Sequence, residues 1–196
     1  IAQYLNNVSL EPFMPDELYH PLDEVNRTIA NKIEHATDVL HRSALEEEYP
    51  EFVEMEKARI KYYYAINLIM HPMGYAMKDT TYRVGDDYQL LEDYMQEDTS
   101  IMEVEPYREF IIEASLILAS KDKSISDSFD KTKARIEYVA QHFENDRFVQ
   151  SLVHDIVLRH LAWRGTDHVD ELTELHNTYV TNQALRDDFV AAIQDK

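Results

Sequence analysis

The chain contains no cysteine, only 3 glycines and only 6 prolines among its 196 residues. Without a thiol it has no cysteine nucleophile, no thiolate metal ligand and no disulfide bond. So few glycines leave few residues able to form the positive-φ turns that a sheet of many strands needs at its hairpins. We therefore expect no β-rich fold.

Basic residues are also scarce, with 19 Lys and Arg against 38 Asp and Glu, and the formal net charge is −19. A surface of this charge repels the phosphate backbone of nucleic acids and the anionic face of a membrane. The nearest approach to a basic block is KDK at 121–123, which falls in a predicted turn. We therefore expect neither nucleic acid nor an anionic membrane surface as a partner.

Long hydrophobic runs are missing as well. The most apolar window, residues 60–70, is about half of the roughly 20 residues that a membrane-spanning helix needs, and it contains Lys61 and Asn67. We expect no direct insertion into a membrane. The chain starts at Ile1 without a basic and then apolar leader segment, which favours a mature chain or a fragment of a longer one.

What the chain does have is helical periodicity, with apolar residues recurring three or four positions apart along most of its length. This pattern predicts helices over residues 22–48, 50–70 and 86–97, one that begins near Pro106, and four more over residues 126–143, 146–163, 167–180 and 182–193. The short links between the last four predict antiparallel hairpins. No fixed repeat is present, so the predicted fold class is all-α: an irregular multi-helix bundle of antiparallel helical hairpins.

Helix ends and domain limits follow from the polar and helix-breaking residues. Asn145, Asp167 and Asn182 are predicted N-caps, because their short side chains can accept hydrogen bonds from the first backbone amides of a helix. Gly165 is a predicted C-terminal stop. Residues 1–21 contain three prolines and little periodicity, which predicts an extended lead-in, followed by a single helical domain over residues 22–196.

The segment from residue 72 to residue 86 is predicted to be a long loop. His71 precedes Pro72, a position from which helical geometry is disfavoured, so the helix before it should end there. The segment contains two of the three glycines and has no period. Two interpretations remain open: a functional or mobile segment, or a crossover that spans the bundle.

Three consecutive tyrosines, Tyr62, Tyr63 and Tyr64, lie inside the second predicted helix. Successive side chains on a helix diverge by about 100°, so the three rings cannot form one stacking surface. Nearly every position from Ile60 onward is apolar or aromatic, which is typical of a helix covered on all sides. We predict that the tyrosines belong to the core and its edge, with a ligand platform as the alternative.

The histidines and carboxylates have spacings that do not match known metal sites. A di-iron bundle needs two Glu-x-x-His pairs, and only Glu17 with His20 has this spacing, with Pro21 directly after it. His154 and His160 are six residues apart and lie on different faces of a helix. The run of three glutamates at 46–48 lacks the spacing of a calcium loop.

Motifs for other chemistry are missing from the sequence, which contains neither a Gly-rich phosphate loop nor a Gly-x-Ser-x-Gly elbow. We therefore predict no catalytic residue, no metal ligand and no cofactor. A metal-dependent enzyme stays open as a third interpretation, and elemental analysis of the purified protein tests it.

Two stretches carry a family resemblance, PEFVEMEKARIKYYYAINL at 50–68 and EVEPYREFIIEASL at 103–116. They are similar to the helical domain that precedes the thioredoxin fold in exported, often lipid-anchored, thiol:disulfide oxidoreductases of Bacteroidetes. The closing FVAAIQDK also resembles the helix before the catalytic domain, and the likeness covers about residues 22–196. The matching residues are Tyr49, Pro50, Phe52, Glu56, Arg59, Tyr62, Pro106, Tyr107, Arg108 and Phe110.

The resemblance implies a periplasmic or cell-envelope protein whose parent performs redox chemistry through a Cys-x-x-Cys motif. This chain lacks the motif, so no catalytic residue of the family can be assigned to any of its positions. The predicted function is a non-catalytic accessory domain that positions a C-terminal thioredoxin-like domain or a client protein. The alternative is a free-standing helical adaptor that binds a protein segment between hairpins. The sequence sets no oligomeric state.

Overall fold

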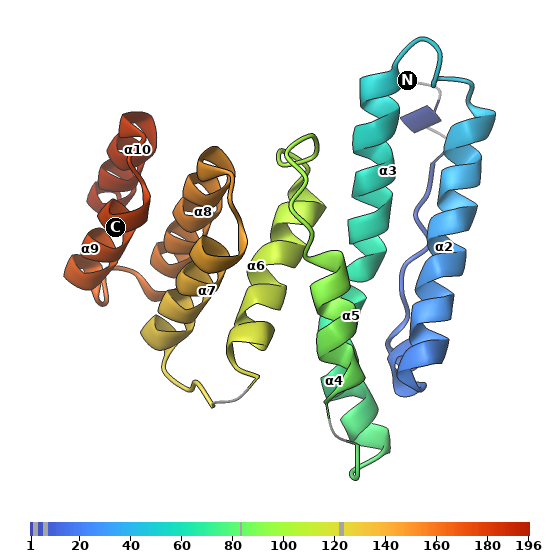
Figure 1. Ribbon diagram of the computed structural model, residues 1–196, viewed down its shortest axis with the longest axis horizontal. Helices are drawn as coiled ribbons and strands as arrows, with labels where there is room; N and C mark the ends of the chain where they lie inside the picture. Colours follow the sequence, from blue (N-terminus) through green and yellow to red (C-terminus); the bar gives the residue numbers. More distant parts are fainter. Residues whose placement is uncertain (2–3, 6–7, 83, 122–123) are drawn as a thin grey trace. The chain divides into compact units, whose positions relative to one another are not determined.

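The computed structural model describes residues 1, 4–5, 8–82, 84–121 and 124–196. The described residues form helices and irregular segments without a strand, which confirms the predicted all-α multi-helix fold. The elements are η1 Pro15–Tyr19, α2 Leu22–Arg42, α3 Pro50–Ala65, α4 Asn67–Lys78, α5 Asp86–Tyr94, α6 Glu105–Ala119, α7 Ser128–His142, α8 Asp146–Arg164, α9 Val169–Tyr179 and α10 Gln183–Gln194 (Figure 1).

The chain packs into two compact units, Ile1–Phe110 and Ile111–Lys196. The division between them falls within α6. That residues 22–196 behave as a single domain stays a prediction. Two residues of the predicted turn at 121–124, and parts of the predicted lead-in and loop, lie outside the described residues.

In the first unit, α2 and α3 form a hairpin (Figure 1). The apolar stripe of α2 is buried through Val25, Ile29, Ala36 and Leu40. The helix ends at Arg42, six residues before the predicted end. Ala44 has a φ of 54°, a left-handed conformation that a right-handed helix cannot contain. The glutamates at 46–48 would also oppose the macrodipole at a helix C-terminus.

The predicted helix end at His71 is wrong, because α4 continues through Pro72 to Lys78. The helix instead breaks at Ile66, which ends α3 and precedes α4. A proline inside a helix costs about 3 kcal/mol, so packing must offset it. Here α4 packs against η1, His71 is fully buried, and Gly74 lies against Leu18. The predicted loop 72–86 therefore shrinks to the segment between Lys78 and Asp86.

In the second unit, α8 packs against α7, α9 and α10. Two predicted N-caps are confirmed: Asn145 accepts from the amide of Phe148 at 2.9 Å, and Asn182 accepts from Ala184 at 2.9 Å. Gly165 ends α8 with a φ of 64°, as predicted.

The predicted N-cap at Asp167 is wrong. His168 holds that position in a left-handed conformation, and its side chain makes no capping hydrogen bond. The helix therefore starts at Val169, two residues after the predicted start, because His168 has a φ of 59° and cannot belong to a right-handed helix. Asp127, which the sequence analysis missed, caps α7 by accepting from the amides of Phe129 and Asp130.

Candidate functional site

The three tyrosines divide between core and edge, which confirms their prediction. Tyr62 and Tyr64 are 2% and 1% exposed, whereas Tyr63 is 36% exposed. The Tyr62 hydroxyl donates to the carbonyl oxygen of Tyr94 at 3.1 Å, and burial raises its pKa. The three side chains therefore do not form one stacking platform.

The two stretches that carry the family resemblance meet around Tyr62. Its ring centroid lies 4.8 Å from that of Tyr107 and 5.5 Å from that of Phe110. The Tyr107 hydroxyl donates to the carbonyl oxygen of Gln96 at 2.7 Å, and burial raises its pKa to about 12. This cluster ties α3 to the start of α6 and to the segment after α5, a structural role in the first unit.

Glu56 and Arg59, also in the resembling stretch, form a partly buried ion pair on α3. Arg59 Nε lies 2.6 Å from Glu56 Oε2, and Nη2 lies 2.7 Å from Oε1, a two-pronged geometry that guanidinium groups favour. Tyr4 donates its hydroxyl to Glu56 Oε1 at 2.8 Å. Burial and the neighbouring Glu56 raise the Tyr4 pKa. These contacts anchor Tyr4 to α3.

The remaining residues of the resemblance lie at helix starts and edges. Tyr49 is the residue before α3 and Pro50 is its first residue, the position that proline favours. The ring of Phe52 packs against the edge of Tyr4 at 6.0 Å. Arg108 donates from Nη1 to the carbonyl oxygen of Met102 at 3.1 Å. Pro106 is the one residue of this group that lines a cavity together with Tyr62.

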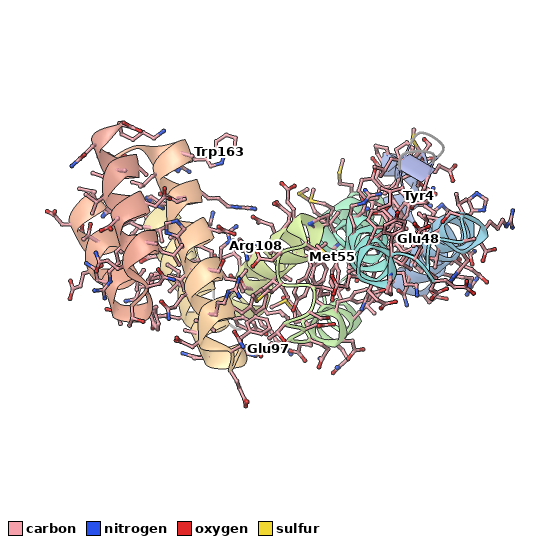
Figure 2. The ribbon with its side chains drawn as sticks, turned by 90° about the horizontal axis from the view of Figure 1, so that it is seen from above. Tyr4, Glu48, Met55, Glu97, Arg108 and Trp163 are labelled. Atoms are coloured by element: carbon pink, nitrogen blue, oxygen red, sulfur yellow. The ribbon has the colours of Figure 1, made fainter. Side chains whose placement is uncertain are left out.

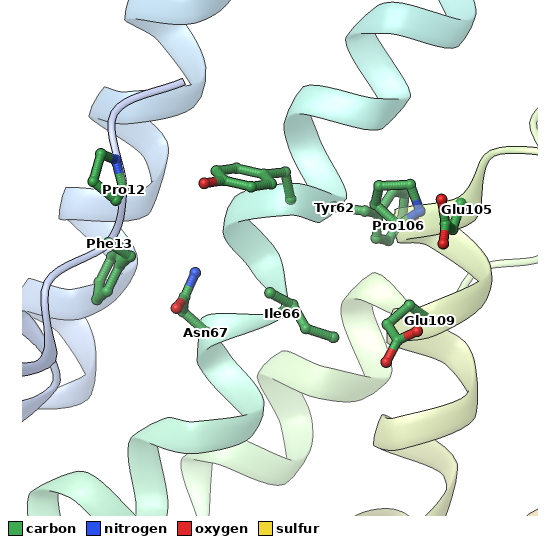
Figure 3. Close-up of a pocket in the computed structure, with 9 residues that line it drawn as sticks. Pro12, Phe13, Tyr62, Ile66, Asn67, Glu105, Pro106 and Glu109 are labelled. Carbon is green, nitrogen blue, oxygen red and sulfur yellow. The ribbon is translucent and has the colours of Figure 1, made fainter. Parts of the chain in front are cut away.

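That cavity, which we call the tyrosine pocket, has a volume of about 390 Å³ and lies within the first unit. The lead-in provides one wall, the junction of α3 and α4 the floor, and the start of α6 the opposite wall (Figure 3). The lining residues are Pro12, Phe13, Tyr62, Tyr63, Ile66, Asn67, Glu105, Pro106 and Glu109. Most of this lining is aromatic or aliphatic, which suits an apolar group.

The polar groups of the tyrosine pocket are placed asymmetrically. Glu105 and Glu109 lie on successive turns of α6, and both line the same wall of the pocket (Figure 3). Asn67 lies on the floor, where its Nδ2 donates to the carbonyl oxygen of Tyr64 at 2.9 Å. The pocket thus combines apolar surface with negative charge on one side, a combination that suits an apolar group next to a cation.

A second cluster in the first unit joins His71, Asp87 and Tyr82. His71 Nδ1 lies 2.6 Å from Asp87 Oδ1, and Nε2 lies 3.0 Å from the carbonyl oxygen of His20. Tyr82 donates its hydroxyl to the other carboxylate oxygen of Asp87. Both ring nitrogens face acceptors, so both donate, and His71 is the imidazolium partner of a buried ion pair.

Burial and hydrogen bonding shift the pKa values of His71 and Asp87 in opposite directions. Burial lowers the pKa of His71, but the bonds to Asp87 and to the His20 carbonyl outweigh it, so the pKa is raised. Burial raises the pKa of Asp87, and the bonds from His71 and Tyr82 reverse this, so the pKa is lowered. Sequence analysis missed the pair because His71 was interpreted only as the residue before Pro72.

The second unit contains a different pair, His154 and His176. His154 Nδ1 lies 3.2 Å from His176 Nε2, and His154 Nε2 lies 3.0 Å from Asp188 Oδ2. Burial, the neighbouring His154 and Arg186 lower the pKa of His176 to about 4, so this imidazole is neutral near pH 7. His160 instead bonds Thr132 at 2.8 Å, so His154 and His160 face different partners, as their spacing predicts.

The remaining candidate metal residues lie in helix-end contacts. Glu17 accepts from the backbone amide of Met14 at 2.6 Å, and His20 pairs with Glu24 at 3.1 Å, so Glu17 and His20 face different partners. Within the described ranges, no three His, Asp or Glu side chains gather as a metal site. Of the helices in the same ranges, none is long and apolar enough to cross a membrane.

Comparison with known proteins adds no relative. No protein-family model, no curated protein and no solved structure matches the chain. The likeness to the helical domain of thioredoxin-like oxidoreductases stays a prediction. The geometry of the chain's own sites must therefore carry the functional argument.

Proposed function

We propose that this chain is a non-catalytic helical binding domain that holds a segment of a protein in the tyrosine pocket. The observation that carries the proposal is the combination of aromatic walls with two carboxylates on one side of a cavity of about 390 Å³. A cavity of this size accommodates one or two side chains. It is built by three separate segments of the first unit, so the native fold forms it before any partner arrives.

The chemistry of the pocket selects the occupant. Phe13 and Tyr63, which are partly exposed, offer ring surface to an aliphatic or aromatic side chain, and the buried Tyr62 backs the pocket. Glu105 and Glu109 favour a neighbouring Lys or Arg, and the first unit contains 23 acidic against 9 basic residues, which attracts a basic segment over longer distances. The proposed occupant is a peptide segment in which an apolar residue is flanked by basic residues.

The resemblance to thioredoxin-like oxidoreductases supports a more specific role. In that role the chain is an accessory domain of an exported redox enzyme, and the segment in the pocket belongs to the catalytic domain or to a client. The alternative is a free-standing adaptor. Sequencing the native coding DNA beyond Lys196 distinguishes them: a Cys-x-x-Cys motif within about 100 residues supports the accessory domain, and an immediate stop codon supports the adaptor.

Calorimetric titration with the peptide acetyl-Lys-Leu-Lys-Lys-amide tests the binding itself. We expect saturable binding that weakens about tenfold in the double variant Glu105→Gln, Glu109→Gln, because each lost charge contact is worth about 1 kcal/mol or less at a solvated rim. Tyr63→Ala should weaken it as well. The control is the double variant Glu34→Gln, Glu47→Gln, which changes the net charge equally at two exposed positions away from the pocket.

Two results would contradict the proposal. One is binding that the control variant weakens as much as the pocket variant, since the peptide would then respond only to net charge. The other is an absence of saturable binding at millimolar peptide, because a pocket built for this chemistry should hold even a short segment at that concentration.

A further inference from the structure

A second cavity lies entirely in the second unit, among α6, α7 and α8. We call it the basic groove, and its volume is about 340 Å³. Four of its lining residues are cationic, Lys131, Arg135, Arg159 and Arg164, and one is a carboxylate, Glu113. In a chain with twice as many acidic as basic residues, this local excess of positive charge is unexpected.

The basic groove already binds one carboxylate, that of the chain itself. Arg135 Nη2 lies 2.8 Å from Glu113 Oε2, and Arg159 Nη1 lies 3.4 Å from Glu113 Oε1. Arg135 also donates from Nε to the carbonyl oxygen of Ile112 at 3.3 Å, which fixes its direction. Two guanidinium groups therefore hold one carboxylate between them.

Lys131 and Arg164 provide the remaining positive charge. Neither forms an ion pair with any residue of the described ranges. Lys131 is half-buried on α7, and Arg164 is exposed on the last turn of α8. A ligand carboxylate between them would find two cations without displacing the contact of Glu113 with its two arginines.

Trp163 lines the same groove and is 85% exposed. Its indole ring projects from α8, as Figure 2 shows. A fully solvated tryptophan is uncommon in a folded protein, and tryptophan is among the residues that contribute most to binding where proteins meet. It supplies an apolar surface beside the cations.

His160 also lines the basic groove, and its Nδ1 lies 2.8 Å from Thr132 Oγ1. Burial lowers the pKa of His160, so the imidazole adds little positive charge to the groove. The charge that an anionic ligand meets there comes from the lysine and the arginines.

We propose that the basic groove binds an acidic peptide segment of a protein partner, with a carboxylate between Lys131 and Arg164 and an apolar side chain against Trp163. A polyanion such as nucleic acid fits poorly, because the net charge of −19 repels it over the rest of the surface. A short acidic segment meets mainly the local positive charge. The proposal is independent of the tyrosine pocket, whose occupant is basic.

Trp163 is the only tryptophan in the chain, so its fluorescence reports on the basic groove directly. The probe is the peptide acetyl-Glu-Phe-Glu-Glu-amide, and the matched probe replaces each Glu with Gln. We expect a saturable fluorescence change with the acidic peptide, weaker binding at high salt, and at least tenfold weaker binding of the Gln peptide. Inorganic phosphate at the same ionic strength should not displace the acidic peptide.

The variant for this test is the double change Lys131→Gln, Arg164→Gln, which should weaken binding about tenfold or more. The control is Lys133→Gln with Arg147→Gln, two exposed cations on the same helices that do not line the groove. It changes the net charge equally and should leave binding within about twofold. Circular dichroism of both variants confirms that the fold is kept.

The proposal is overturned by equal binding of the two peptides, by equal loss in the two double variants, or by displacement with phosphate at millimolar concentration. The last result would assign the groove to phosphate. An absence of peptide binding at the tyrosine pocket would not affect the test of the basic groove. The two experiments use different peptides and different variants, and the two cavities lie in different units.

Discussion

At the scale of single residues, two buried histidines have surroundings that favour opposite protonation states. His71 faces the Asp87 carboxylate and a backbone carbonyl, and these raise its pKa against the effect of burial. His176 faces another imidazole, and burial lowers its pKa to about 4. The same side chain is thus a charged ion-pair partner in one unit and a neutral packing element in the other.

Removal of the His71 side chain should strongly destabilise the first unit. His71→Ala leaves the Asp87 carboxylate buried without its cation, and we expect a loss of about 3–5 kcal/mol in the free energy of unfolding, measured with urea. His35→Ala, at an exposed position of α2, is the control and should change it by less than about 0.5 kcal/mol. A loss below about 1 kcal/mol for His71→Ala would show that the pair does not hold the fold.

The tyrosine triplet provides a second comparison at this scale. Tyr64 is almost fully buried and Tyr63 is partly exposed, so Tyr64→Ala should cost about 3–5 kcal/mol and Tyr63→Ala about 1 kcal/mol or less. Thermal unfolding of the two variants checks the order. If Tyr63→Ala were the more destabilising variant, the weakened binding expected from it could not be assigned to the tyrosine pocket.

At the scale of elements, the sequence pattern predicted the bounds of those helices whose ends depend only on neighbouring residues. The caps Asn145 and Asn182 and the stop at Gly165 need only neighbouring backbone atoms, and α8 and α10 begin and end within about a residue of expectation. The predicted helix end before Pro72 was wrong, because the helix continues only where it packs against η1, more than 50 residues earlier in the chain. No local pattern contains the contact between Leu18 and Gly74.

That contact makes a direct prediction for α4. A Cβ atom at Gly74 would lie 2.9 Å from Leu18 Cβ, so Gly74→Ala should destabilise the first unit by about 1–3 kcal/mol despite the better helix propensity of alanine. Gly85→Ala is the control, since nothing lies within 4 Å of its added methyl group. Chemical unfolding measures both, and a stabilising effect of Gly74→Ala would contradict the proposed packing of η1 on α4.

At the scale of the whole molecule, the two cavities could not be derived from the sequence because each collects residues from distant segments. The resemblance did mark Tyr62 and Pro106, but Phe13 enters the tyrosine pocket from the lead-in. The cations of the basic groove come from separate helices and form no block in the sequence. The net charge predicted that the surface repels anions. Only the fold shows that the cations of α7 and α8 gather in one groove, where the local charge is positive.

Because the pKa values of His71 and His176 are shifted in opposite directions, we expect the stability of the two units to depend on pH in opposite ways. The unfolded state binds a proton at His176 near pH 6.5 and the folded state only near pH 4, so stability of the second unit falls as pH decreases through this window. The full loss is about 3 kcal/mol. His71 acts oppositely: its contribution is present below about pH 6.5 and is lost as pH rises through its raised pKa.

Hydrogen exchange of the backbone amides of α8 measures the stability of the second unit as a function of pH. We expect the free energy of unfolding to fall between pH 6.5 and 4, and His176→Leu to flatten this slope. Because α8 lies in the second unit, His71→Ala should not flatten this slope. An equal slope in His176→Leu and the unchanged protein would assign the pH dependence to the carboxylates instead.

The central claim is that the tyrosine pocket of an all-helical, acidic chain binds a protein segment. Chemical-shift mapping by NMR with acetyl-Lys-Leu-Lys-Lys-amide tests it most directly. The account predicts that the shifted amides cluster around Tyr63, Ile66 and Asn67 and at the start of α6, and that the shifts disappear in Glu105→Gln, Glu109→Gln. Shifts that scatter over the acidic surface, or that persist unchanged in this variant, would contradict it.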